Sequence, residues 1–230
     1  MAGWIDKRPE LLAEIRAHLV AQHADLHLRI IGGRASIHGS FAITDGEGVV
    51  DRFQIIIRFP DDYPVDPPTL EEVGGRIPRG QERHVEPHGI ACLTVPEEWH
   101  FLSKDRSFAA FIEGPIKNFL VSQSTYEATG QWPFGERPHG YDGLIDAYGA
   151  WFGSNDPAVI RSHLRYLAAA APKGHWDCPC GSGKKVRRCS HRDRLAELRS
   201  KLPMDAAQRT LKRFEQKGAQ LELGGKSSEQ

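Results

Sequence analysis

The chain begins with the residue spacing of an amphipathic helix. Apolar side chains recur every three to four positions near the N-terminus, at Leu11, Leu12, Ile15, Leu19 and Val20. This spacing places them on one face of a helix that we expect to run to about Gln22. Asp6 is the predicted N-cap and Pro9 belongs in the first turn.

Three extended stretches follow, each rich in β-branched or aromatic residues. They are LHLRII (26–31), ASIHGSFAI (35–43) and VVDRFQIIIRF (49–59). Gly32-Gly33 separates the first two, and DGEG (45–48) separates the second from the third. Short apolar runs bounded by such turn residues are typical of hairpins, so we predict an antiparallel meander.

Prolines interrupt the extended pattern after this meander. Pro64, Pro67 and Pro68 lack amide donors, so residues 61–68 cannot form a central strand and are predicted to make a rigid elbow. A short edge strand is predicted at 70–73. The apolar spacing then favours a helix over 106–120, irregular at Gly114-Pro115, and another over 141–152.

The last third of the chain is predicted to be helical around a group of cysteines. Asn155-Asp156-Pro157 is a helix-start signal, and the helix should end before Pro172. Helical sequence resumes after the cysteines to about Leu223, and the polar end, 224–230, is predicted to be disordered. We therefore expect an α+β fold, with one domain over 1–153 and a second over 154–230.

Composition narrows the functional classes. The chain is 40% hydrophobic and 26% charged, and it has no run of roughly 18 apolar residues that could span a membrane. Its N-terminus lacks the apolar core of a secretory signal, so we expect a cytoplasmic protein with no membrane partner.

Charge is divided unevenly although the net charge is zero. Residues 1–153 hold 14 Lys and Arg against 22 Asp and Glu, whereas residues 154–230 hold 16 against 8. The halves thus carry −8 and +8. A basic segment binds nucleic acid, the ribosome or an acidic protein surface, or it is a solvated helix face docked on the acidic domain. Charge alone leaves both interpretations open.

Three thiols and one imidazole lie close together in CPCGSGKKVRRCSH (178–191). Four such ligands suit tetrahedral zinc, and a module this small buries too little core to fold without an ion. The predicted ligands of this structural Zn²⁺ site are Cys178, Cys180, Cys189 and His191. A disulfide or an accidental cluster is the alternative.

The remaining cysteine, Cys92, lies in HGIACLTVPEEW (88–99). A thiol is only a few per cent ionised at neutral pH, yet its thiolate is a strong nucleophile. His84 and His88 are close in sequence and are candidate supporting residues. Two alternatives stay open: an inert buried cysteine, and a metal site that combines His84, His88, Cys92 and His100.

Two family resemblances add to this interpretation. The elbow YPVDPP (63–68), Cys92-Leu93 and Trp99 together resemble the active-site half of ubiquitin-conjugating enzymes, over roughly residues 6–153. The resemblance implies a ubiquitin-conjugating-like fold in which Cys92 carries a protein C-terminus as a thioester. The family's His-Pro-Asn is represented at best by His84 in HVEP, so its oxyanion-stabilising asparagine is missing. The cysteine group resembles the SEC-C motif, which implies protein or ribosome binding, although here Ser190 separates Cys189 from His191.

The segment WPFGERPHGYDGL (132–144) is similar to one in bacterial relatives encoded beside cGAS-like nucleotidyltransferases in antiphage systems. The resemblance implies that the partner is the C-terminus of such a nucleotidyltransferase. The chain has no phosphate-binding glycine loop, so an activated donor must come from elsewhere, for example from an activating enzyme. The alternative function is a noncatalytic adaptor whose zinc module and basic tail recruit a protein, the ribosome or nucleic acid.

Overall fold

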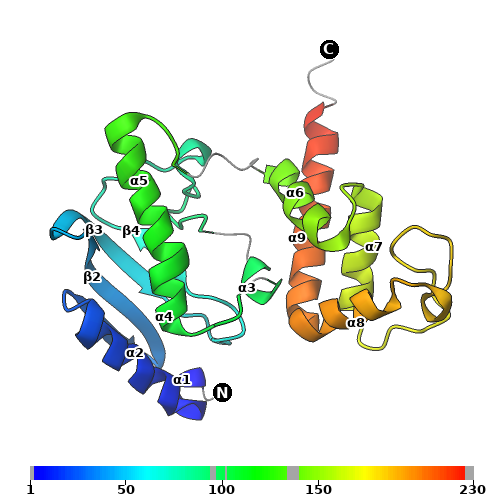
Figure 1. The fold of residues 1–230 in the computed structure, drawn as a ribbon, viewed down its shortest axis with the longest axis horizontal. Helices are drawn as coiled ribbons and strands as arrows, with labels where there is room; N and C mark the ends of the chain where they lie inside the picture. The colour runs from blue at the N-terminus through cyan, green and yellow to red at the C-terminus, as the bar shows by residue number, and fades with distance from the viewer. Residues whose placement is uncertain (1–2, 94–96, 102, 134–139, 226–230) are drawn as a thin grey trace. The chain divides into compact units, whose positions relative to one another are not determined.

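The computed structural model describes residues 3–93, 97–101, 103–133 and 140–225, and the chain divides into two compact units. The first unit holds Met1–Trp99 with Ser103–Glu136, and the second holds His100–Leu102 with Arg137–Gln230. Figure 1 draws both. The division near residue 136 differs from the predicted boundary at 153. The difference arises because the helix over 140–152 packs within the second unit, against its other helices.

The first unit is built on a four-stranded antiparallel sheet. The strands are β1 (Leu26–Ile31), β2 (Arg34–Thr44), β3 (Val49–Arg58) and β4 (Thr69–Glu72), in the order β1-β2-β3-β4. The predicted meander and edge strand are therefore confirmed. Gly32 and Gly33 both have positive φ, 58° and 75°, as the two-residue turn between Ile31 and Arg34 requires.

Strand β2 alternates buried and partly exposed positions, so one face of the sheet forms the core. Gly39 interrupts this alternation for a steric reason. A Cβ at Gly39 would lie 2.0 Å from the carbonyl oxygen of Asp25, and its φ of +142° is rarely adopted by other residues. The absence of a side chain lets the amide of Ser40 donate to that oxygen at 3.1 Å. Gly39 thereby allows β1 to enter the sheet close to β2.

Helices cover the sheet (Figure 1). They are α1 (Trp4–Lys7), α2 (Pro9–Gln22), α4 (Phe108–Phe111) and α5 (Lys117–Thr129), with the π-helical η2 (Ile112–Ile116) between α4 and α5. Two further short segments are η1 (Gln81–Arg83) and α3 (Glu98–Phe101), whose residues divide between the two units. Helix α2 contacts β1 and α4, and α5 contacts β2. The core side chains with the least exposure are Ile15, Ile37, Phe41, Phe53, Ile55, Ile57, Leu70, Ile112, Ile116 and Leu120.

Two helix predictions of the first unit have different outcomes. The irregularity at Gly114-Pro115 is confirmed, because both residues lie in η2, where a proline without an amide donor widens the turn. The N-cap prediction at Asp6 is wrong. Asp6 lies inside α1, and Arg8 precedes α2, whose first residue is Pro9. The chain makes one separate turn before the amphipathic helix because a proline is best tolerated at a helix start.

The second unit consists of helices around the cysteine segment. They are α6 (Gly140–Phe152), α7 (Pro157–Ala168), α8 (Arg192–Lys201) and α9 (Met204–Gly225), with the short η3 (Val186–Arg188). Helix α7 packs on α9 and α6. The predicted helix start at 155–157 is confirmed: Asp156 is the N-cap of α7 and accepts from the Ala158 amide at 2.8 Å.

None of the helices in the described part of the chain combines the length and the apolar character needed to cross a membrane. Disorder was predicted over 224–230: residues 224 and 225 belong instead to α9, and residues 226–230 lie outside the described residues.

Candidate functional site

Cys92 is exposed and lies on a loop that is joined by main-chain bonds to the edge of the sheet. The amide of Ala91 donates to the carbonyl of Leu70 in β4 at 2.8 Å, and the amide of Cys92 donates to the carbonyl of His84 at 2.7 Å. Ala91 also forms an antiparallel bridge with Val85. Since Val85 and Ala91 are both buried, the loop is anchored on the N-terminal side of the exposed thiol.

Side chains of α5 brace the same loop. The Arg83 guanidinium donates to Gln123 Oε1 at 2.9 Å, and Gln123 Nε2 donates to the Arg83 carbonyl at 2.7 Å. Gln123 is fully buried, and Arg83 also reaches Glu127 at 3.2 Å. The Arg83 guanidinium lies 5.0 Å from the centre of the Tyr126 ring. These contacts hold the loop against α5 immediately before the turn that leads to Cys92.

The two predicted supporting histidines have different surroundings. The His84 ring lies edge-on to Trp132 with centroids 5.1 Å apart, and Trp132 stacks on Tyr126 at 4.4 Å. His84 has a left-handed φ of 52° and is joined to Cys92 through the main chain. His88 is exposed and pairs with Glu86 at 2.8 Å. Their support of Cys92 stays a prediction.

The proline elbow and the tryptophan are structural parts of the first unit. The Tyr63–Pro64 bond is cis, and the Tyr63 ring is buried between Trp4 and Phe59, with centroids 5.0 and 4.9 Å away. Burial raises the pKa of Tyr63 to about 12. Trp99 is buried edge-on to Phe111 at 5.3 Å. The elbow thus packs its tyrosine into the core and leaves its prolines on the connection to β4.

The structure brings the three clustered cysteines together. The sulfur atoms of Cys178, Cys180 and Cys189 all lie within 4.8 Å of one another, and Cys180 and Cys189 are 3.6 Å apart. All four cysteines of the chain lie in the described residues, and none of them forms a disulfide. Three convergent sulfurs are a donor set that a soft or borderline metal ion prefers. The disulfide alternative is therefore absent from this structure.

A short hairpin holds the cysteines at this spacing. The amide of Cys178 donates to the Lys184 carbonyl at 2.8 Å, and Asp177 forms an antiparallel bridge with Lys185. Gly181 and Gly183 both have positive φ, 78° and 69°, so the chain can turn closely around the sulfurs. The turn residues therefore serve the cluster and not only the connection between helices.

Hydrogen bonding and burial act on the thiols in opposite directions. Burial raises the pKa of Cys178, whereas a hydrogen bond with Ser182, 3.4 Å from the sulfur, lowers the pKa of Cys189. A metal ion binds thiolates, so binding would release protons from this cluster.

The predicted fourth ligand, His191, has a defined partner. Its Nε2 lies 2.9 Å from Nε2 of His163, and Nδ1 of His163 lies 2.9 Å from the Val159 carbonyl. A carbonyl only accepts, so the proton of a neutral His163 is on Nδ1, and its Nε2 must accept from His191. The pKa of His163 is lowered to about 4 by burial, which keeps this ring neutral. Nδ1 of His191 is then left with a lone pair.

The position of His191 differs from that of the cysteines. Within the described part of the hairpin the three sulfurs lie within 4.8 Å of one another, and no ring nitrogen of His191 belongs to that group. The structure thus brings together three of the four predicted ligands and leaves the fourth next to them in sequence. Over the ranges that the structure describes, the alternative metal set of His84, His88, Cys92 and His100 is not among the groups gathered within that distance.

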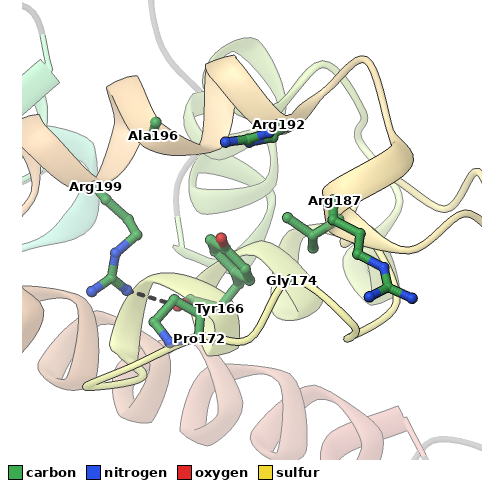
Figure 2. Close-up of a pocket in the computed structure, with 8 residues that line it drawn as sticks. Tyr166, Pro172, Gly174, Arg187, Arg192, Ala196 and Arg199 are labelled. Carbon is green, nitrogen blue, oxygen red and sulfur yellow. Dashed lines mark hydrogen bonds between the residues drawn. The ribbon is translucent and has the colours of Figure 1, made fainter.

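An open, arginine-rich pocket of about 540 Å³ lies beside the cysteine hairpin (Figure 2). Its lining includes Tyr166, Arg187, Arg192 and Arg199. The guanidinium of Arg199 is used within the fold, because its Nη1 donates to carbonyls at the end of α7, including that of Ala169 at 2.9 Å. Arg187 and Arg192 are exposed and give the pocket its positive charge.

Sequence reasoning identified Cys92 and the cysteine cluster but missed their supports. No sequence motif marks the supporting residues Gln123, Glu127 and His163. The one signal in the sequence was a polar residue at a helix position where the spacing predicts an apolar one. Comparison of the chain with protein-family models, with curated proteins and with solved structures finds no match. Its function is therefore inferred from its own residues.

Proposed function

We propose that this protein is a ubiquitin-conjugating-like acyl carrier that captures the C-terminus of a partner protein as a thioester on Cys92. The observation that supports this most directly is the exposed thiol on a loop anchored to β4 and braced by α5. The order of helix, antiparallel meander, proline elbow, cysteine and helix is the order that the sequence resemblance implies. Anchoring restricts the positions that the thiol can take, which favours reaction with an extended chain end.

The chemistry needs few groups. The Cys92 thiolate attacks the activated carbonyl of the partner's C-terminus, a sulfur–carbon bond forms, and the bond to the leaving group breaks. The leaving group is AMP from an acyl adenylate or the thiolate of an upstream carrier, and the Cys92 proton has passed to solvent before the attack. An activating enzyme with ATP supplies the donor. The missing His-Pro-Asn asparagine removes the oxyanion stabilisation that transfer to a lysine uses, so water or no acceptor competes with a lysine.

The partner and setting come from the resemblance of residues 132–144. We infer a cGAS-like nucleotidyltransferase C-terminus in antiphage defence, in the cytoplasm, where thiols stay reduced. Residues 134–139 of that segment lie outside the described residues. The support is therefore the sequence of the segment, not its structure.

We also propose that the cysteine hairpin binds structural Zn²⁺ through Cys178, Cys180, Cys189 and His191. The three gathered sulfurs fit zinc, and the orientation of His191 by His163 leaves Nδ1 available as the fourth donor. When bound, the ion would tie the hairpin to the start of α8. The module would then present its surface to a protein partner, as the SEC-C resemblance implies.

Intact-mass measurement tests the carrier function. The full chain is incubated with the nucleotidyltransferase, the activating enzyme and ATP. The wild type should gain the mass of the partner in an adduct that thiols cleave, and Cys92→Ala should gain none. Cys92→Ser should form an ester that thiols do not cleave. If the wild type and Cys92→Ala show the same adduct, or neither shows one, the carrier function is excluded.

The second candidate function is a noncatalytic adaptor. The observation that favours it is the pocket flanked by the exposed Arg187 and Arg192, which suits an acidic protein or a nucleic-acid phosphate. The adaptor predicts steeply salt-dependent binding that Arg187→Gln/Arg192→Gln weakens and Cys92→Ala leaves unchanged. The carrier function predicts instead that Cys92→Ala abolishes the covalent adduct with the partner.

A further inference from the structure

Three side chains of the first unit converge at a second place, apart from the cysteines. One ligand atom from each of His18, His23 and Glu113 lies within 4.8 Å of the others. Nε2 of His23 is 2.8 Å from Glu113 Oε1, and Nε2 of His18 is 3.4 Å from the same oxygen. Two imidazoles at the end of α2 and a carboxylate ninety positions after His23 therefore point at one small volume.

Aromatic packing holds both rings in this orientation. His23 follows the last residue of α2, and its amide donates to the Leu19 carbonyl at 2.8 Å. The His23 ring stacks on Phe41 of β2 with centroids 5.0 Å apart and an interplanar angle of 29°. The His18 ring lies edge-on to Phe108 at 6.1 Å. The two nitrogens are thus positioned by the core and not only by attraction to Glu113.

The carboxylate comes from the irregular turn that the sequence predicted. Glu113 is the second residue of the π-helical η2, which contains Gly114 and Pro115. Single π-helical turns inside α-helices occur frequently at functional sites, because the wider turn redirects a side chain. Here Glu113 is directed to α2, and 39% of its side chain is exposed.

The cluster contains a polar atom that its protein neighbours do not satisfy. Nε2 of His18 is shielded from solvent and forms no hydrogen bond within the described part of the chain, although Glu113 is near. A buried polar group without a hydrogen-bond partner destabilises the folded state. Lys117 is the other charged group at the cluster, 3.5 Å from Glu113 Oε2. Lys117 thus contacts Oε2 of Glu113, whereas both histidines are near Oε1.

We propose that His18, His23 and Glu113 form a binding site for a divalent transition-metal ion, for which Zn²⁺ is the suitable probe. Imidazole nitrogen with one carboxylate is a donor set that such ions take, whereas Ca²⁺ and Mg²⁺ require more oxygen ligands than one carboxylate supplies. An ion would give all three groups a common partner, including Nε2 of His18. Three protein ligands leave a coordination position for water on the exposed side.

The ion would join α2 to η2 and stabilise the first unit. This site shares no residue with Cys92 or with the cysteine hairpin, so it is independent of the proposed function. Because its ligands contain no sulfur, it also differs spectroscopically from the hairpin. Cobalt bound by thiolates shows an intense sulfur-to-metal charge-transfer absorption, which a site of two histidines and a carboxylate lacks.

Metal counting on the full chain tests the proposal. The protein is stripped with a chelator and titrated with Zn²⁺, and bound ions are counted by native mass spectrometry; Co²⁺ absorption is recorded in parallel. Compared with the wild type, Glu113→Gln and His23→Gln should each lose one bound ion and keep the charge-transfer band. Cys178→Ser should lose the band and keep the ion at the histidine cluster. His27→Gln, which removes an exposed histidine of β1, should lose neither.

Stability measurements separate ligand loss from misfolding. His18→Gln is added as a further variant of the proposed ligands. The melting temperature of each metal-free variant is compared with that of the metal-free wild type, and equal values show that the variant still folds. Zn²⁺ should raise the melting temperature of the first unit in the wild type, in His27→Gln and in Cys178→Ser, but not in the variants of His18, His23 or Glu113. The proposal is overturned if the wild type binds only the ion of the cysteine hairpin, which the charge-transfer band identifies. It is also overturned if Glu113→Gln and His18→Gln bind as many ions as the wild type.

Discussion

The buried amide of Gln123 donates to the Arg83 carbonyl at 2.7 Å and accepts from the Arg83 guanidinium at 2.9 Å. This reciprocal pair joins α5 to the loop that carries Cys92, across forty positions of sequence. A fully buried amide with both of its functions occupied is costly to replace, because truncation leaves its partners unsatisfied. The pair therefore links the stability of the first unit to the placement of its thiol.

Replacing Gln123 should lower both stability and thioester formation. Gln123→Ala removes both hydrogen bonds of the pair, and we expect the free energy of unfolding to fall by about 1–3 kcal/mol. Urea denaturation measures this loss, and intact mass measures loading of Cys92. Asn118→Ala, at an exposed position of the same helix, is the control and should change neither. Equal losses in the two variants would contradict the assignment.

Removing the proposed zinc should unfold the cysteine hairpin. Cys189→Ser or a chelator should release the ion, and the amides of residues 174–190 should then exchange rapidly with solvent, because such a small module has little core of its own. Hydrogen-exchange mass spectrometry with metal analysis follows both events. Cys92→Ser changes a residue of the other unit, so this variant should retain the hairpin ion and the slow amide exchange of the hairpin. Slow exchange in the metal-free hairpin would show that the ion is not structural.

His163 should position the fourth zinc ligand without binding the ion. Its ring stacks on Phe152 with centroids 4.7 Å apart and an interplanar angle of 6°, so His163→Phe keeps the packing and removes the hydrogen bond to His191. Loss of such an outer contact lowers metal affinity by about 10–100-fold. Competition with a chromophoric chelator measures the affinity. His175→Gln, an exposed histidine of the same unit, is the control, and an unchanged affinity in His163→Phe would refute the role.

Asp51 should make the first unit sensitive to acid. Hydrogen bonds from Arg76 lower the pKa of Asp51 from 3.8 to about 2, against the effect of burial, and Ser124 adds a further bond. A folded-state pKa below the unfolded value contributes stability that is complete above pH 3.8 and is lost as the pH falls toward about 2. Asp51→Asn should therefore show a flatter loss of stability over this interval.

Urea denaturation at a series of pH values measures the slope of that loss. Asp61→Asn is the matched control, because the Asp61 side chain is 78% exposed and its pair with Arg34 is at the surface. Its slope should equal that of the wild type. If Asp51→Asn also keeps the wild-type slope, the Asp51–Arg76 pair does not control acid sensitivity.

The amino-acid sequence by itself determined the secondary structure around the candidate sites. The alternation in β2, the prolines of the elbow and the Gly114-Pro115 pair each act on their immediate neighbours, so the meander, its end and the irregular helix were predictable. The cysteines 178–189 are close in sequence, and a short hairpin suffices to bring them together. Each of these features depends only on residues that are close in sequence, so the sequence pattern was enough to predict it.

Only the tertiary structure decided which distant side chains meet. The path of the chain brings Gln123 to Arg83, His163 to His191 and His23 to Glu113, the last pair across ninety positions. It also decided that Cys92 is exposed and that α6 belongs with the second unit. These contacts depend on how helices pack on a shared core, and hydrophobic periodicity states which face of a helix is buried but not which partner that face meets.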